Sequence, residues 1–205
     1  MSDSILSKLK RDKMLLPALK DYSIQPLKRE ENIALYLCLS IISQQLSTRV
    51  ANIICDRFLE LLGPSNYSCD RIRTIEKGAL RSIGLSESKA VYIHNVCDFF
   101  VEQGLDDSSL HSMNDEEILQ TLIQIKGVGN WTIQMLLMFA MAREDVFAPD
   151  DLGIQKAMVD LYSLQPTSPK ELKKSMSAIS QHWQPYRTYA CLALWKWNDK
   201  RKKTG

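Results

Sequence analysis

The spacing of apolar residues is the feature that most restricts the fold of this chain. Apolar residues recur three or four positions apart almost throughout the 205 residues, as in Ile33, Leu37 and Ile41. That spacing places apolar side chains on one face of a helix, whereas a half-buried strand is apolar at every second position. No sustained alternation of the second kind occurs, and valines are few. The sequence therefore predicts an all-α protein.

Composition and charge limit the class of protein. Apolar residues make up 45% and charged residues 24%, which is typical of a globular chain. No apolar run approaches the roughly 18 residues that cross a membrane, and the N-terminus lacks the apolar block of a signal peptide. We therefore expect an intracellular protein without a membrane partner, in the cytoplasm and nucleoid of a bacterium or the nucleus of a eukaryote. The formal net charge of +2 neither excludes nor establishes a nucleic-acid partner.

Helix-start residues divide the apolar pattern into segments. Ser47, Ser86 and Asn114 are typical helix N-caps, and Ser168-Pro169 followed by Glu171 is typical of a capping box. The basic run Lys200–Lys203 is expected to be a solvated, frayed end. The predicted helices are about 4–21 with a break before Pro17, 33–43, 48–62, one near 72, 76–83, 86–102, 114–125, 131–142, one from 150 or 151, one from 168, and 186–198.

The turn Gly127-Val128-Gly129 lies between two of these helices. Glycines leave the peptide N–H groups open to a ligand, and the next helix begins at once. The positive end of that helix favours an anion such as a DNA phosphate, to which Lys126 adds charge. The alternative is a plain turn between two helices.

Four segments together resemble a known family. They are Leu122–Thr132 with its Gly-Val-Gly turn and the following Val146–Asp151, Ser40–Ser47, Leu80–Leu85 with Lys89-Ala90 after it, and Trp183–Thr188 with Leu194-Trp195 after it. Their order and content resemble the helix-hairpin-helix DNA glycosylase superfamily, and most nearly its alkylation-repair branch, the 3-methyladenine DNA glycosylase II type. The resemblance covers about residues 33–197.

The resemblance implies one domain over residues 1–205, made of two helical lobes flanking a DNA-binding cleft. Lobe A would cover about 33–142 with the hairpin, and lobe B about 1–32 plus 143–205. Only helical sequence precedes Ile33, so the extra N-terminal β-domain of some relatives is not expected.

The resemblance also implies that Asp151 is the catalytic group. Cleavage of an N-glycosidic bond builds positive charge on the sugar, which a nearby carboxylate stabilises while it orients the attacking water. The alternative is that Asp150 and Asp151 only cap the next helix, and we expect that role for Asp150. Both roles are compatible in Asp151.

Trp131 indicates the type of reaction and of base. Relatives with lyase activity carry a lysine here, whose amine attacks the sugar; an indole cannot, and Lys126 precedes the hairpin. The expected enzyme is therefore monofunctional. Trp131 and Tyr186 match the family's base-pocket aromatics, and Met135 replaces a further one. An aromatic face favours a cationic alkylated base. Packing in the core is the alternative for all three.

The family pattern also places other residues at the DNA. Ile42 matches the apolar wedge that fills the gap left by a flipped base, unless it is a core residue of its helix. Gln44 and Gln45 contact DNA or cap that helix. Trp183, Trp195 and Trp197 are expected to pack the final helices.

No metal or redox cofactor is expected. The iron–sulfur cluster of some relatives needs four close cysteines near the C-terminus, where only Cys191 lies. The remaining cysteines fit reduced core thiols. The resemblance allows a monovalent cation at the hairpin carbonyls when DNA is bound.

The sequence thus predicts a monomeric DNA glycosylase that releases alkylated purines, 3-methyladenine and by extension 7-methylguanine, from double-stranded DNA. The alternatives are a non-catalytic protein that binds abasic or damaged DNA, and a glycosylase for hypoxanthine or ethenoadenine. A helical protein-interaction domain would leave the turn, Trp131 and Asp151 unexplained.

Overall fold

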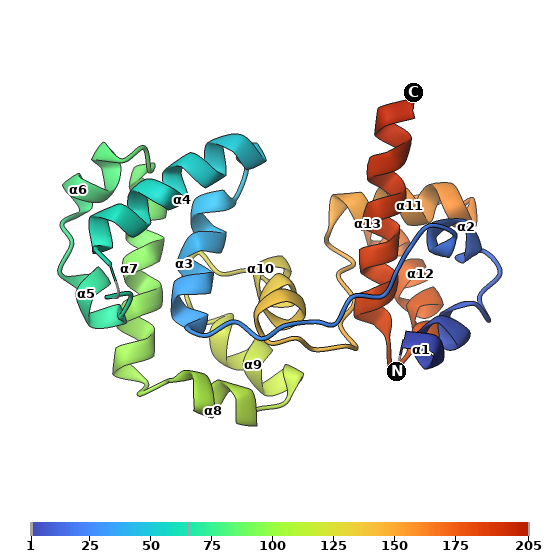
Figure 1. Cartoon of the computed structure of the whole chain (residues 1–205), viewed down its shortest axis with the longest axis horizontal. Coiled ribbons are helices and arrows are strands. Elements are labelled where there is room, and N and C mark those ends of the chain that lie inside the picture. The colour runs from blue at the N-terminus through green and yellow to red at the C-terminus, as the bar shows by residue number, and fades with distance from the viewer. Residues whose placement is uncertain (1, 65, 205) are drawn as a thin grey trace. The chain divides into compact units, whose positions relative to one another are not determined.

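The computed structural model describes residues 2–64 and 66–204, and these residues contain helices and no strand. The all-α prediction is confirmed. The chain divides into two compact units: unit 1 is Met1–Lys28 with Leu137–Gly205, and unit 2 is Arg29–Leu136 (Figure 1). The sequence analysis set the lobe boundaries near 33 and 142. The second boundary falls earlier, inside a continuous apolar stretch where the pattern gives no sign of a break.

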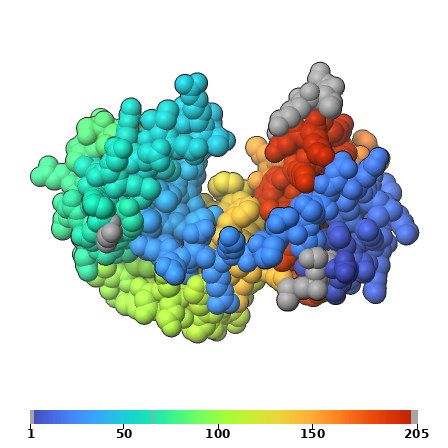
Figure 2. Space-filling view, in the orientation of Figure 1, coloured from blue at the N-terminus to red at the C-terminus, as the bar shows by residue number. Residues whose placement is uncertain are grey.

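Unit 2 is built around one long helix. Its helices are α3 (Ile33–Ser43), α4 (Thr48–Leu62), α5 (Cys69–Arg73), α6 (Lys77–Ser82), α7 (Glu87–Glu102), α8 (Asp107–Ser112), α9 (Asp115–Leu122) and α10 (Asn130–Met135). Helix α7 packs against α3, α5 and α6, and α3 also packs against α4 (Figure 1). The outer side of α4 is open to solvent, as the space-filling view shows (Figure 2).

Unit 1 is organised around the last helix. It contains α1 (Ser2–Leu9), α2 (Leu16–Leu19), α11 (Leu152–Tyr162), α12 (Pro169–Ser180), a 3₁₀ turn (Gln181–Trp183) and α13 (Arg187–Thr204). Helix α13 packs against α11 and α2. The indole of Trp183 is fully buried, and its Nε1 donates to the carboxylate of Asp12 at 2.8 Å. No helix in the described part of the chain is long and apolar enough to span a membrane.

The predicted helix starts agree well with the structure. Ser47, Ser86, Asn114 and Ser168 each accept a hydrogen bond from the backbone N–H three residues on. Of these four residues, Asn114 alone forms a complete capping box, with Glu117. These starts were predictable because a cap involves residues three positions apart.

The capping box predicted at Ser168 is incomplete, because Glu171 does not bond to the backbone N–H of Ser168. The carboxylate of Glu171 accepts from the backbone N–H of Thr167 at 2.8 Å and also from the Thr167 hydroxyl. It thus reaches one residue beyond the cap.

Other differences lie where the apolar pattern is ambiguous. Helix α1 ends at Leu9, well before Pro17, which lies in the first turn of α2. Helix α8 was not predicted, because six residues carry too little periodicity. The final helix runs on through the basic tail to Thr204 instead of fraying near Asn198. The predicted helix 131–142 becomes α10 followed by a π-helical turn, Leu136–Ala140.

The hairpin turn between α9 and α10 is held against α7. Gly127 has a positive φ of 107°, and a Cβ atom there would lie 2.3 Å from Cγ of Tyr92. The Asn95 side chain donates to the carbonyl of Lys126 at 3.0 Å. A side chain at position 127 would thus meet both a strained backbone and a ring with no space for it.

We predict that Gly127→Ala lowers the free energy of unfolding by at least about 2 kcal/mol, from backbone strain and overpacking. Gly129→Ala is the matched control, because Gly129 has a φ of −111° and nothing within 4 Å of its added Cβ. It should cost no more than about 1 kcal/mol, as expected at an N-cap. Urea denaturation measures both, and equal losses would refute this account of the hairpin.

Candidate functional site

The residues singled out by the sequence are distributed over both units. Asp151 and Tyr186 lie in unit 1. The others lie in unit 2: Ile42, Gln44, Gln45, Lys126, Gly127, Val128, Gly129, Trp131 and Met135.

The hairpin presents one buried and several accessible residues. Val128 is 5% exposed, and its N–H donates to the carbonyl of Ile125 at 3.0 Å. Lys126 and Gly129 are exposed on either side of it. Gly129 is the N-cap of α10, whose first N–H groups point out of the helix end. This arrangement can bind a phosphate through backbone donors with a lysine close by.

The turn between α3 and α4 is held by a lysine that the sequence analysis did not assign. The ammonium group of Lys89 donates to the carbonyls of Ile42 at 2.9 Å and Gln44 at 2.7 Å. Partial burial lowers the pKa of Lys89. Its partners are more than forty residues away, so no local pattern could have indicated the contact.

Gln44 and Gln45 differ in their roles. The backbone N–H of Gln44 caps α3 by donating to Ser40 and Ile41, and its side chain donates to the hydroxyl of Thr132 at 3.2 Å. Gln45 is exposed with a positive φ of 61°. The structure therefore favours capping for Gln44 and leaves Gln45 accessible at the turn.

Ile42 is 0% exposed in the core of unit 2. The structure thus favours the core alternative over the wedge, because a residue on the inner face of α3 would have to leave the core to enter DNA. The apolar pattern of α3 had already included this position, and burial decides between the two interpretations.

The two pocket residues of α10 differ in accessibility. Trp131 is 38% exposed. Met135 is 8% exposed, and its carbonyl accepts a bond from the Tyr36 hydroxyl at 3.3 Å. Trp131 is thus partly accessible to a ligand, whereas Met135 is mainly a core residue.

Asp151 occupies the start of α11. It is the N-cap of that helix, and its Oδ1 accepts from the backbone N–H of Ile154 at 2.9 Å. The same Oδ1 accepts from Nε1 of Trp195 at 2.7 Å. The carboxylate is half-buried, so solvent reaches it while two N–H donors stabilise its negative charge.

Asp150 has a separate function in the fold. Its carboxylate forms an ion pair with Lys173 of α12 and does not cap α11. The expectation that Asp150 is the cap is therefore wrong, and the two adjacent carboxylates have different partners.

Trp195 is the residue of this site that the sequence analysis missed, since it was expected only to pack the final helices. Its ring stacks on Phe139 of the π-helical turn, with centroids 5.8 Å apart and planes at 28°. Phe139 is 38% exposed. The presence of Leu194-Trp195 in a recognised segment was the only available signal.

In unit 1, Tyr186 and its neighbours along the chain interact with other side chains, and Cys191 lies near Asp151. Tyr186 is half-buried and meets Tyr189 edge-on, with centroids 6.3 Å apart. Arg187 forms an ion pair with Asp145 at 2.8 Å. Burial raises the pKa of the Cys191 thiol to about 12, and the charge of Asp151 adds to the effect. The thiol beside the carboxylate therefore stays protonated.

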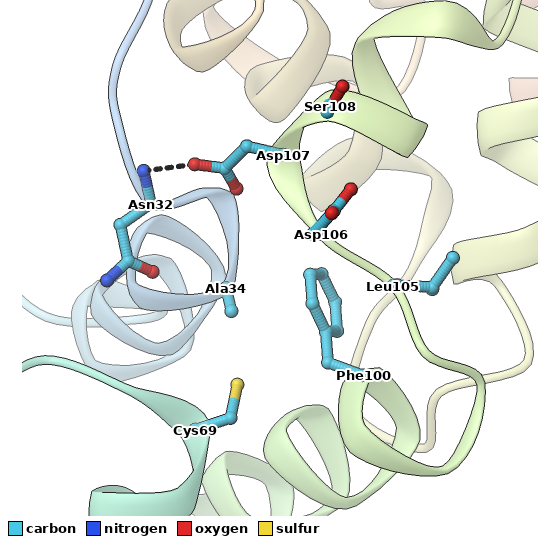
Figure 3. A pocket seen from close by; sticks show the side chains of 8 residues that line it. All are labelled: Asn32, Ala34, Cys69, Phe100, Leu105, Asp106, Asp107 and Ser108. Atoms are coloured by element: carbon cyan, nitrogen blue, oxygen red, sulfur yellow. Dashed lines mark hydrogen bonds between the residues drawn. The ribbon is translucent and has the colours of Figure 1, made fainter.

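A hollow of about 500 Å³ in unit 2 is a different feature. Cys69, Phe100, Asp106 and other residues line it, and Asp107 accepts the N–H of Asn32 at 2.6 Å on its rim (Figure 3). None of the residues singled out by the sequence lines it. No group of three or more His, Cys, Asp or Glu within residues 2–64 and 66–204 is placed to hold a metal ion.

Comparisons with known proteins by sequence and by structure point to the same family. The family model described as HhH-GPD superfamily base excision DNA repair protein matches residues 38–182. A putative DNA-3-methyladenine glycosylase of Bacillus subtilis is 32% identical over 88% of this chain. The chain spans 61% of that relative's length.

Solved structures agree with the sequence match. A DNA-3-methyladenine glycosidase of Bacillus halodurans superposes with a TM-score of 0.80 at 32% identity, covering 96% of this chain and 89% of the other. The 3-methyladenine DNA glycosylase of Schizosaccharomyces pombe bound to abasic DNA has a TM-score of 0.80 at 27% identity, with 94% and 95% covered.

The family match covers most of the chain, and the helical fold agrees with it over nearly the whole length. The resemblance inferred from the four sequence segments is therefore confirmed. The chain belongs to the HhH-GPD superfamily of base excision DNA repair proteins, among relatives of the 3-methyladenine DNA glycosylase type.

Proposed function

We propose that this chain is a monofunctional DNA glycosylase that hydrolyses the N-glycosidic bond of alkylated purines, above all 3-methyladenine, in double-stranded DNA. The main observation in support is the Asp151 carboxylate. Two N–H donors hold it at the start of α11, and the residue is only half-buried. The named activities of the relatives support the same reaction.

The proposed reaction needs a fixed negative charge. As the bond between the base nitrogen and C1′ breaks, its electrons leave with the base and the sugar becomes positively charged. Asp151 stabilises that charge, and the oxygen of a water molecule forms the new bond to C1′ while the water loses one proton to the surrounding solvent. Because a carboxylate and water suffice, the reaction requires no metal or redox cofactor. A monovalent cation at the hairpin carbonyls in the DNA complex is compatible with it.

Alkylated purines fit this site for a chemical reason. Alkylation at N3 or N7 makes the base cationic, so it departs without a dedicated general acid. An aromatic ring such as that of the partly exposed Trp131 favours such a cation by roughly 0.5–2 kcal/mol. The hairpin and Lys126 supply the contacts to the DNA backbone. We propose that the chain acts as a monomer on flipped-out bases.

Replacing Asp151 by asparagine removes the negative charge and keeps the ability to cap α11. Asparagine caps a helix about as well as aspartate, so Asp151→Asn should fold normally and bind DNA. Base release from methylated DNA in single turnover should fall by roughly 10²- to 10³-fold, the usual loss for one charge-stabilising group.

Asp150→Asn is the matched control for that experiment. It changes the neighbouring carboxylate, which pairs with Lys173, and it should leave base release near the wild-type rate. Equal loss in both variants, or wild-type turnover in Asp151→Asn, would contradict the role of Asp151. Tight binding to abasic DNA with no release by the wild type would instead indicate a non-catalytic damage-binding protein.

The absence of lyase chemistry is tested by trapping. A lysine nucleophile forms a Schiff base with the sugar, and position 131 carries an indole instead. Incubation with methylated DNA and borohydride should therefore give no covalent protein–DNA adduct. Strand cleavage should appear only after alkali treatment. A borohydride-trapped adduct from wild-type protein would overturn the monofunctional assignment.

A further inference from the structure

We infer that Trp195 is a positioning residue that fixes the orientation of the Asp151 carboxylate. This inference rests on the proposed glycosylase function and adds a second residue to it. It does not require Trp195 to touch the substrate.

One oxygen of Asp151 accepts two hydrogen bonds. The torsion of a carboxylate about its last side-chain bond is broad, so a single hydrogen bond leaves it free to rotate. Oδ1 of Asp151 accepts from Ile154 N at 2.9 Å and from Trp195 Nε1 at 2.7 Å. The first donor belongs to the backbone of α11 and the second to a side chain of α13. Two donors from separate helices define the carboxylate plane where the cap alone would not.

Trp195 is itself held by its neighbours in unit 1. One side of its ring stacks on Phe139 at 5.8 Å. Gly153 also lies close to the indole. A Cβ atom added at Gly153 would be 3.1 Å from Cδ1 and 3.3 Å from Nε1 of Trp195. The same Cβ would be 3.1 Å from Oδ1 of Asp151. The indole thus stacks on Phe139, and the missing side chain of Gly153 leaves room for its hydrogen bond to Asp151.

Packing of the indole alone would not require the hydrogen bond to Asp151. An indole packed between α13 and its neighbours would stabilise unit 1 without its N–H reaching Asp151. The N–H of the half-buried Trp195 nevertheless donates to Oδ1 of Asp151, the oxygen proposed to face the developing charge. Misplacement of a reacting group by about 1 Å can cost on the order of 100-fold in rate, so loss of this bond should affect the chemical step.

The test removes the donor and retains the ring. Trp195→Phe keeps an aromatic partner for Phe139 but lacks the N–H. Trp197→Phe is the matched control, two residues along α13, where the indole contacts Arg201 at 4.6 Å and has no role in the proposed site. We expect Trp195→Phe to lower the single-turnover rate of 3-methyladenine release by about 10- to 100-fold. The Kd for an abasic-site duplex should not change, and Trp197→Phe should match wild type in both measurements.

Gly153→Ala provides a second variant that leaves Trp195 in place. Its added methyl group meets the indole and Oδ1 together, so it should reduce the same rate, again with an unchanged Kd. A purely structural role for Trp195 would lower the melting temperature and weaken DNA binding along with the rate.

The outcomes separate this inference from the proposed function. The positioning role is overturned if Trp195→Phe releases base at the wild-type rate. It is also overturned if this variant loses rate, DNA binding and stability in parallel. In either case, base release by the unmodified protein still supports the glycosylase function. No base release by the wild-type protein refutes the proposed function, and the positioning role falls with it.

Discussion

The hydrogen bonds to one oxygen of Asp151 connect the main elements of unit 1. Through Ile154 the carboxylate begins α11, and through Trp195 it ties that helix to α13. These two helices form the principal packing pair of the unit. The glycine at position 153 allows the approach. A group proposed to act in chemistry is therefore also part of the structure that holds it, which limits its movement during the reaction.

In unit 2, α7 has the corresponding supporting role. Tyr92 lies under Gly127 of the hairpin, and Asn95 binds the carbonyl of Lys126. One turn earlier, Lys89 binds the carbonyls of Ile42 and Gln44. One helix thus fixes both turns that the sequence assigns to DNA contact. Rigid support of this kind lowers the entropic cost of ordering those turns on binding.

Much of the fold could be predicted because its signals are local. The caps at Ser47 and Asn114 act over three residues, so sequence alone located those helix starts. Lys89 and Trp195 were missed because their partners lie more than forty residues away. Ile42 fits the apolar pattern of α3 as well as a wedge, and only its burial separates the two. Distant pairing and burial are properties of the tertiary structure, which periodicity does not contain.

The charge of Asp151 exceeds what folding requires. Asparagine or serine would also cap α11, and either would accept the indole N–H of Trp195. A half-buried carboxylate costs desolvation free energy that a neutral cap would avoid. It also sits close to the buried Cys191 thiol, whose pKa its charge raises further. The capping geometry therefore explains why a short polar side chain occupies this position, whereas the negative charge is best explained by the cationic sugar that the proposed reaction creates.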